Sequence, residues 1–137
     1  MYRIGKRFTF EAAHWLAGLP ESHKCGREHG HSYTVEVILA AAELSGPGFV
    51  VDFAELDPIK KHLGDVFDHR KLNDVIDVEP TSENLARVLF DWCTATLPLP
   101  ATVAVEAVRV SETLTTWAEY RPGPVPPGHK NRVVPPE

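Results

Sequence analysis

Two strand-like runs constrain the fold of this 137-residue chain more than any other feature. Residues 2–13 alternate between apolar and polar side chains, and residues 31–41 are rich in β-branched and aromatic ones. We predict two strands, the first ending at or just beyond His14, with a loop over residues 16–28 between them. A hairpin-like pairing of the strands would bring the end of the first beside the start of the second.

Three histidines and a thiol lie within eighteen residues at this junction: His14, Cys25, His29 and His31. Residues two apart on a strand face the same side, so His29 and His31 point one way, and strand pairing would place His14 beside them. Neutral imidazole suits zinc, and three such ligands leave a fourth tetrahedral position free. A lone histidine at a strand end is commonly a hydrogen-bonded structural residue. A His-x-His pair with a third histidine favours a catalytic metal site.

Three further features each allow two interpretations. Cys25 is either a fourth zinc ligand, which would close the site, or a nucleophile or base beside it. Asp68 either orients His69, so that this imidazole can take a proton from a thiol, or caps local backbone. Glu112 is either a solvated turn residue or an anchor for a ligand with paired N–H donors.

The rest of the pattern predicts two helices and three shorter strands. A turn over residues 45–48 should lead into a short strand over residues 49–53. The first helix is expected from an Asp57 N-cap to Phe67, with one buried face: Ile59, Leu63, Val66 and Phe67. The second should be capped by Thr81 or Ser82, with Cys93 as a core thiol beside its buried face: Leu85, Val88, Leu89 and Trp92.

Residues 103–110 and 114–120 are expected to form an antiparallel pair of strands. Proline accounts for six of the last sixteen residues, so we expect no packed element there. Strands segregated from two helices indicate an α+β sheet with both helices on one face. The net charge of −5 is negative, whereas a nucleic-acid-binding surface is positively charged, so we do not expect nucleic acid as a partner. The sequence shows neither a membrane-length apolar run nor a secretory signal, so we expect a cytosolic protein with two free thiols.

Six motifs occur in the order seen in the 6-pyruvoyltetrahydropterin synthase / 6-carboxytetrahydropterin synthase family, which the chain resembles from about residue 3 to residue 121. They are Phe10-Glu-Ala-Ala-His14, Cys25-Gly-Arg-Glu-His29-Gly-His31-Ser-Tyr33, Val51-Asp-Phe53, Asp68-His-Arg-Lys-Leu-Asn73, Pro80-Thr-Ser-Glu-Asn-Leu-Ala86 and Glu112-Thr113. The resemblance implies one domain over residues 1–121, with a Pro-rich tail over residues 122–137 outside it. It also implies a tunnelling fold (T-fold): a four-stranded antiparallel sheet with two helices on one face. Trimers would close these sheets into a barrel and pair into a homohexamer.

The resemblance further implies a role for each motif. Zinc would bind His14, His29 and His31, and Cys25 would act as base or acid, activated by Asp68 and His69 of a neighbouring subunit. Glu112 would anchor the pterin edge, with Thr113 beside it. We also suggest Lys24, Arg27 or Arg70 for the substrate's triphosphate, because they lie near the motifs.

Within the family, the short Cys-x₃-His-Gly-His spacing resembles the bacterial 6-carboxytetrahydropterin synthases. Such a lyase would convert 7,8-dihydroneopterin triphosphate to 6-carboxy-5,6,7,8-tetrahydropterin, releasing acetaldehyde and triphosphate, in 7-deazapurine (queuosine) biosynthesis. The alternatives are a 6-pyruvoyltetrahydropterin synthase, a non-catalytic pterin-binding homologue, and a cupin-type metal enzyme that uses Glu36. Against the cupin, the glycine spacing before His29 is wrong and the sequence has no second cupin histidine motif.

Overall fold

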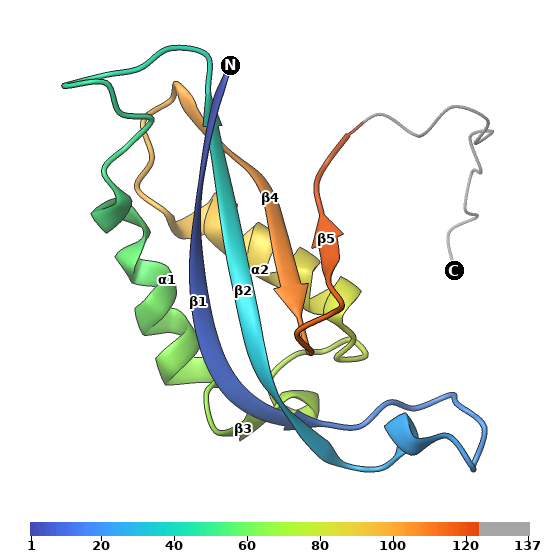
Figure 1. Cartoon of the computed structure of the whole chain (residues 1–137). Coiled ribbons are helices and arrows are strands. Elements are labelled where there is room, and N and C mark those ends of the chain that lie inside the picture. Colours follow the sequence, from blue (N-terminus) through green and yellow to red (C-terminus); the bar gives the residue numbers. More distant parts are fainter. Residues whose placement is uncertain (124–137) are drawn as a thin grey trace, which may run out of the picture.

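The computed structural model describes residues 1–123, which form a five-stranded sheet covered on one face by two helices (Figure 1). The strand order is β3-β1-β2-β4-β5, and every pairing is antiparallel except that of β3 with β1. The elements are β1 (Tyr2–His14), β2 (His29–Ala41), α1 (Asp57–His62), β3 (Arg70–Lys71), α2 (Ser82–Thr96), β4 (Val103–Ser111) and β5 (Ala118–Tyr120). The four antiparallel strands and two helices expected of a T-fold are confirmed, and β3 adds a fifth strand.

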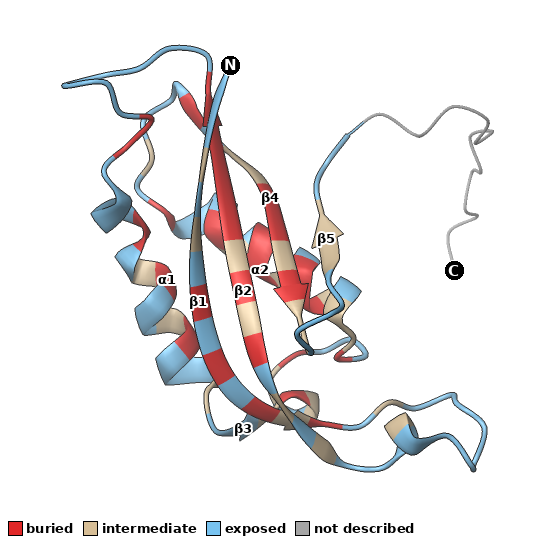
Figure 2. Ribbon diagram, in the orientation of Figure 1, coloured by how far each residue is buried: buried red, intermediate tan, exposed pale blue. Residues whose placement is uncertain are grey.

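Alternation along the two long strands builds the core. Figure 2 shows buried and exposed residues alternating along the lower half of β1. Phe8 and Phe10 are buried in the core, where Phe10 contacts Phe67. Phe10 lies opposite Tyr33 of β2, and the two rings stack with centroids 4.9 Å apart. Directly opposed residues of an antiparallel pair share a face. The same register therefore sets His14 opposite His29, at the far end of this buried face.

The first helical segment begins earlier than predicted. A 3-10 turn over Phe53–Leu56 precedes α1, and its cap is Asp52, whose carboxylate accepts a hydrogen bond from the Ala54 N–H. The chain is already helical at Leu56, so the prediction of Asp57 as the N-cap was wrong. After His62 the helix continues as one π-helical turn over Leu63–Phe67. The wider turn rotates the buried face, which leaves Val66 exposed although it was expected inside.

Two of the predicted strands also differ from the structure. Residues 49–53 form no strand: Ser45 and Phe49 make an isolated bridge that closes the Gly-Pro-Gly turn upon itself. The last strand was expected over residues 114–120 but is confined to Ala118–Tyr120. The Thr113 and Thr116 hydroxyls bond to each other at 2.6 Å, closing a loop before β5. The predicted tail lies, from residue 124 onward, outside the described residues.

The N-terminus of α2 was predicted correctly, and it offers a test of local stability. Thr81 caps the helix, with its hydroxyl accepting a hydrogen bond from the Asn84 N–H at 3.1 Å. We expect Thr81→Ala to lower the free energy of unfolding by about 1 kcal/mol, because a helix-terminal N–H loses its acceptor. Urea unfolding measures this, with Ser82→Ala as the control, since Ser82 is the first helical residue and not the cap. Equal losses in the two variants would contradict the assignment of the cap.

The sheet face away from the helices is crossed by ion pairs. Glu36 of β2 bonds to Arg7 of β1 at 2.9 Å and lies 3.9 Å from Arg109 of β4, which reaches Glu119 of β5 at 3.1 Å. These charges tie four strands together on a face that the helices leave open. Among the helices of the described chain, none is long and apolar enough to cross a membrane.

Candidate metal centre

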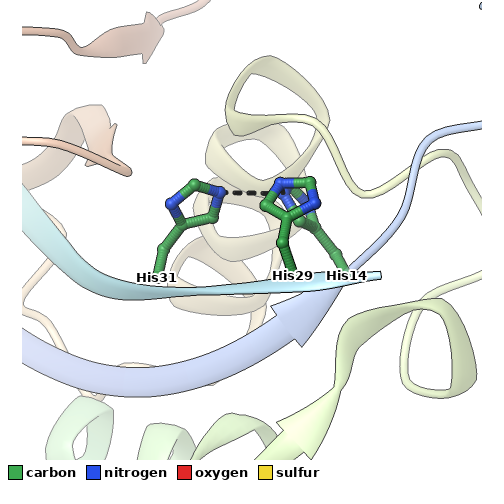
Figure 3. A group of neighbouring side chains, drawn as sticks. All are labelled: His14, His29 and His31. Carbon is green, nitrogen blue, oxygen red and sulfur yellow. Dashed lines mark hydrogen bonds between the residues drawn. The ribbon is translucent and has the colours of Figure 1, made fainter. Parts of the chain in front are cut away.

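The three predicted imidazoles converge at one end of the sheet (Figure 3). The Nε2 atom of His14 lies 3.0 Å from Nε2 of His29 and 3.1 Å from Nε2 of His31. One ligand atom from each ring falls within 4.8 Å of the others. His14 is buried, whereas His29 and His31 are half-buried, so the cluster is shielded by the protein on one side and reachable on the other.

Backbone carbonyls fix which nitrogen of two rings carries the proton. Nδ1 of His14 lies 2.7 Å from the Pro80 carbonyl, and Nδ1 of His29 lies 2.6 Å from the Arg27 carbonyl. A carbonyl oxygen can only accept, so each Nδ1 is the donor and each neutral ring presents a bare Nε2 lone pair. Metal-ligating histidines are oriented in the same way by partners of the outer shell.

The cluster fits a divalent cation on these grounds. The bare Nε2 lone pairs of His14 and His29, 3.0 Å apart, repel each other, and a cation between them would turn that repulsion into coordination. Burial is the largest effect on the pKa of His31 and lowers it. The neighbouring rings of His14 and His29 also lower this pKa, whereas the charge of Glu112 raises it. The net effect is a lowered pKa. His31 is therefore neutral near pH 7, as a metal ligand must be. The donor set, three imidazole nitrogens, suits zinc.

Cys25 is not part of this centre. The ligand group found within residues 1–123 contains His14, His29 and His31 without the thiol. Cys25 sits on a short 3-10 turn over Lys24–Gly26, where the imidazole of His23 accepts its backbone N–H and its carbonyl accepts the Leu16 N–H. The turn fixes a half-buried thiol in the loop just before His29. Cys25 is therefore outside the group of candidate ligands, and its role as a reactive group stays a prediction.

Asp68 fulfils both roles that the sequence left open. One carboxylate oxygen accepts the Glu11 N–H at 2.8 Å, which is a backbone cap, and the other accepts Nδ1–H of His69 at 2.8 Å, which orients that ring. These two bonds lower the pKa of Asp68, the backbone bond more strongly. His69 has a φ of +57°, the one positive φ of a non-glycine residue in the described chain, and its N–H bonds to the Glu11 carbonyl. Such strain is often found at functional sites.

The Asp68–His69 pair does not meet Cys25 within one chain. The exposed His69 ring lines a cavity of roughly 530 Å³ that also involves Gly30, Ser32 and one of the three clustered histidines, His31. Gly30 and Ser32 alternate with the histidines of β2, so this cavity opens mainly on the sheet face opposite the helices. Within residues 1–123, no hydrogen bond joins the Cys25 thiol to either residue of the pair.

Glu112 and Thr113 face different sides. The Glu112 carboxylate lies 3.7 Å from Nε2 of His31 and 4.0 Å from Nε2 of His14, and it lines a cavity of roughly 270 Å³ with Thr81 and Ser82. Thr113 lines a separate cavity on the open face of the sheet. The structure thus brings Glu112 to the histidines and leaves Thr113 apart from them.

Two kinds of group that contact the histidines were not predicted from the sequence. The carbonyls of Pro80 and Arg27 orient the candidate ligands His14 and His29, but a backbone oxygen leaves no trace in residue type. Tyr33 was expected as a strand residue and as the last residue of a family motif, with no role of its own. Its ring lies edge-on to those of His31 and His14, with centroids 5.5 Å and 6.0 Å apart. Its position two residues after His31 was the signal that could have identified it, because it shares the face of the histidines.

Comparisons with known proteins find similarity over most of the chain. The family model described as 6-pyruvoyl tetrahydropterin synthase matches residues 3–123. A 6-carboxy-5,6,7,8-tetrahydropterin synthase of Synechocystis is 41% identical, with 88% of this chain and 93% of that protein aligned. The Bacillus subtilis protein of the same name is 34% identical, with 88% and 86% aligned.

A solved structure extends the similarity to three dimensions. The 6-pyruvoyl tetrahydropterin synthase of Caenorhabditis elegans superposes with a TM-score of 0.76 at 26% sequence identity. The alignment covers 89% of this chain and 96% of that one. The arrangement of sheet and helices in Figure 1 is therefore that of a known pterin enzyme.

Proposed function

The chain belongs to the 6-pyruvoyl tetrahydropterin synthase family, and on that premise we propose that it converts 7,8-dihydroneopterin triphosphate to 6-carboxy-5,6,7,8-tetrahydropterin, releasing acetaldehyde and triphosphate. The observation that carries the proposal is the convergence of one ligand nitrogen from each of His14, His29 and His31. The relatives at 34–41% identity bear the name of this reaction. The product would feed synthesis of 7-deazapurines of the queuosine type.

Each residue of the site has a distinct task in this proposal. His14, His29 and His31 hold zinc, which would act as a Lewis acid and stabilise negative charge on the oxygens of the substrate side chain. Cys25 moves protons at that side chain as a thiolate. Glu112 accepts two N–H groups from the edge of the pterin ring. We assign the triphosphate to Lys24, Arg27 or Arg70, and of these Arg70 lines the larger cavity beside His69.

We further propose that the active site is completed by a second copy of the chain in a hexamer made of two trimers. The support is the position of Asp68 and His69, whose cavity opens mainly away from the face that carries the imidazoles. A neighbouring subunit would present its own pair to Cys25, where His69, oriented by Asp68, takes the thiol proton.

Product analysis tests the proposed reaction. Purified protein of known metal content is incubated with 7,8-dihydroneopterin triphosphate, and the pterin products are identified by mass spectrometry. We expect 6-carboxy-5,6,7,8-tetrahydropterin with one acetaldehyde per turnover. A 6-pyruvoyl product without acetaldehyde would instead assign triphosphate elimination. Pterin binding without consumption would leave a non-catalytic homologue.

The proposed role of Glu112 gives a separate prediction. Glu112→Ala is expected to weaken pterin binding by about tenfold or more, because hydrogen bonds to a charged acceptor are lost, while the metal content stays unchanged. Titration with the fluorescent oxidised pterin neopterin measures the affinity. Glu106→Ala is the control, since Glu106 is a similarly shielded carboxylate on β4 that pairs with Arg3 and Arg121. Equal affinities in wild type and Glu112→Ala would refute the role.

A further inference from the structure

Asn73, the last residue of the motif that begins at Asp68, makes two hydrogen bonds to which the proposed reaction gives no task. Its Oδ1 accepts the Trp15 N–H at 3.0 Å, and its Nδ2–H donates to the Trp15 carbonyl at 2.9 Å. A backbone N–H donates and a carbonyl accepts, so these two partners fix the orientation of the amide. Asparagine has both the acceptor and the donor that such a pair requires.

The Asn73 side chain continues a strand pairing where the backbone leaves it. β3 pairs in parallel with the end of β1 and then gives way to a 3-10 turn over Leu72–Asp74, which the fully buried Leu72 anchors. The amide of Asn73 supplies the Trp15 backbone with the donor and the acceptor that a longer β3 would offer. The chain is therefore held in place immediately after His14.

Glu79 makes a similar bond two residues further along the loop. Its Oε2 accepts the Ala17 N–H at 3.1 Å. Its carbonyl accepts Nδ2–H of Asn84, in the first turn of α2, at 3.0 Å. The start of the loop is thus tied to the N-terminal end of a helix.

Leu16 lies between these two fixed residues and bonds to the 3-10 turn that carries Cys25. Its N–H donates to the Cys25 carbonyl at 2.9 Å. Within residues 1–123, the other hydrogen bonds of this turn are local and involve His23 and Arg27. The bond from Leu16 therefore connects the turn to the part of the chain that Asn73 and the helix hold.

We propose that Asn73 is a positioning residue. It fixes the backbone of Trp15 and thereby Leu16, which in turn holds the 3-10 turn of Cys25 in place. Glu79 supports Leu16 from the other side. The inference rests on the proposed function, because only that function gives Cys25 a catalytic task.

Amide hydrogen exchange of Leu16 tests the inference without substrate. We expect Asn73→Asp to speed exchange of the Leu16 N–H by about tenfold or more. The new side chain has nearly the same size but sets an acceptor, in place of the donor, against the Trp15 carbonyl, whereas the acceptor of the Leu16 N–H itself is unchanged. Mass spectrometry with electron-transfer fragmentation measures exchange residue by residue, with the buried Val35 of β2 as the internal reference.

Glu79→Gln is the matched control. It makes the opposite change, from carboxylate to amide, but keeps a side-chain oxygen to accept the Ala17 N–H, so Leu16 should exchange as in the wild type. Unchanged exchange of Leu16 in Asn73→Asp would overturn the inference. An equal rise at Val35, which signals general destabilisation, or an equal rise in Glu79→Gln would overturn it as well.

Turnover connects the inference to Cys25. With 7,8-dihydroneopterin triphosphate as substrate, Asn73→Asp should lower kcat about tenfold and leave KM within about twofold. Its metal content should stay unchanged, because His14 is also held by its pairing with His29 and by the Pro80 carbonyl. A wild type without turnover would defeat the proposed function, and the exchange measurement would still decide whether Asn73 holds the turn. Faster exchange of Leu16 with an unchanged kcat would overturn the positioning role.

Discussion

A His29→Ala variant is expected to lose its bound divalent metal and to lose turnover by more than about 100-fold. His29 supplies one of three Nε2 atoms, and changes to the outer-shell partners of metal ligands alone cost roughly 10–100-fold. His29 is the ligand to remove, because its half-buried ring leaves a smaller internal cavity than that of the buried His14. The metal-to-protein ratio after dialysis, measured by plasma mass spectrometry, gives the first readout, and product formation gives the second.

His62→Gln is the matched control for this prediction. His62 is also half-buried, but it stacks on Trp92 of α2 with ring centroids 4.0 Å apart and has no contact with the cluster. Its replacement should lower the stability of the helix pair and leave the metal content unchanged. Retention of one metal per chain by His29→Ala would refute the three-histidine centre, whatever the turnover.

The convergence of the histidines could be predicted because it follows from strand periodicity. A spacing of two residues puts His29 and His31 on one face, and burial of one face fixes the register that sets His14 opposite His29. A slip of one residue would turn Phe10 and Tyr33 toward solvent. The apolar residues of β1 and β2 thus determine where the three histidines meet.

The surroundings of the Asp68–His69 pair could not be predicted in the same way. Strand β3 has two residues, too few to show a period, and it exists because Arg70 and Lys71 pair with Ala12 and Ala13 of β1. The bonds from Asp68 and His69 to the backbone of Glu11 depend on that tertiary contact. The π-helical turn before Asp68 could not be predicted either. Its period differs from that of an α-helix, so Val66 is exposed although α-helical spacing placed it on the buried face.

A Cys25→Ala variant is expected to keep its metal and to lose turnover by about 10²–10⁴-fold, the contribution usual for a positioned acid or base. The thiol lies outside the three-imidazole group, on the 3-10 turn before His29, so its removal leaves all three Nε2 atoms in place. Metal analysis and turnover on the same preparation separate the two functions. Loss of metal would make Cys25 a structural ligand, and unchanged turnover would assign the proton transfer to another group.

The other cysteine makes this test specific. Cys93 is buried on α2, and burial raises the pKa of its thiol to about 12, so it forms almost no thiolate at neutral pH. We expect Cys93→Ala to retain turnover and to lose about 1–2 kcal/mol of unfolding free energy through the cavity that it leaves. Iodoacetamide should then label Cys25 in the folded protein and both thiols after denaturation. A reactivity of Cys25 no greater than that of Cys93 would contradict its role as a thiolate base, because a group that transfers protons at the substrate must be reachable and ionisable near neutral pH.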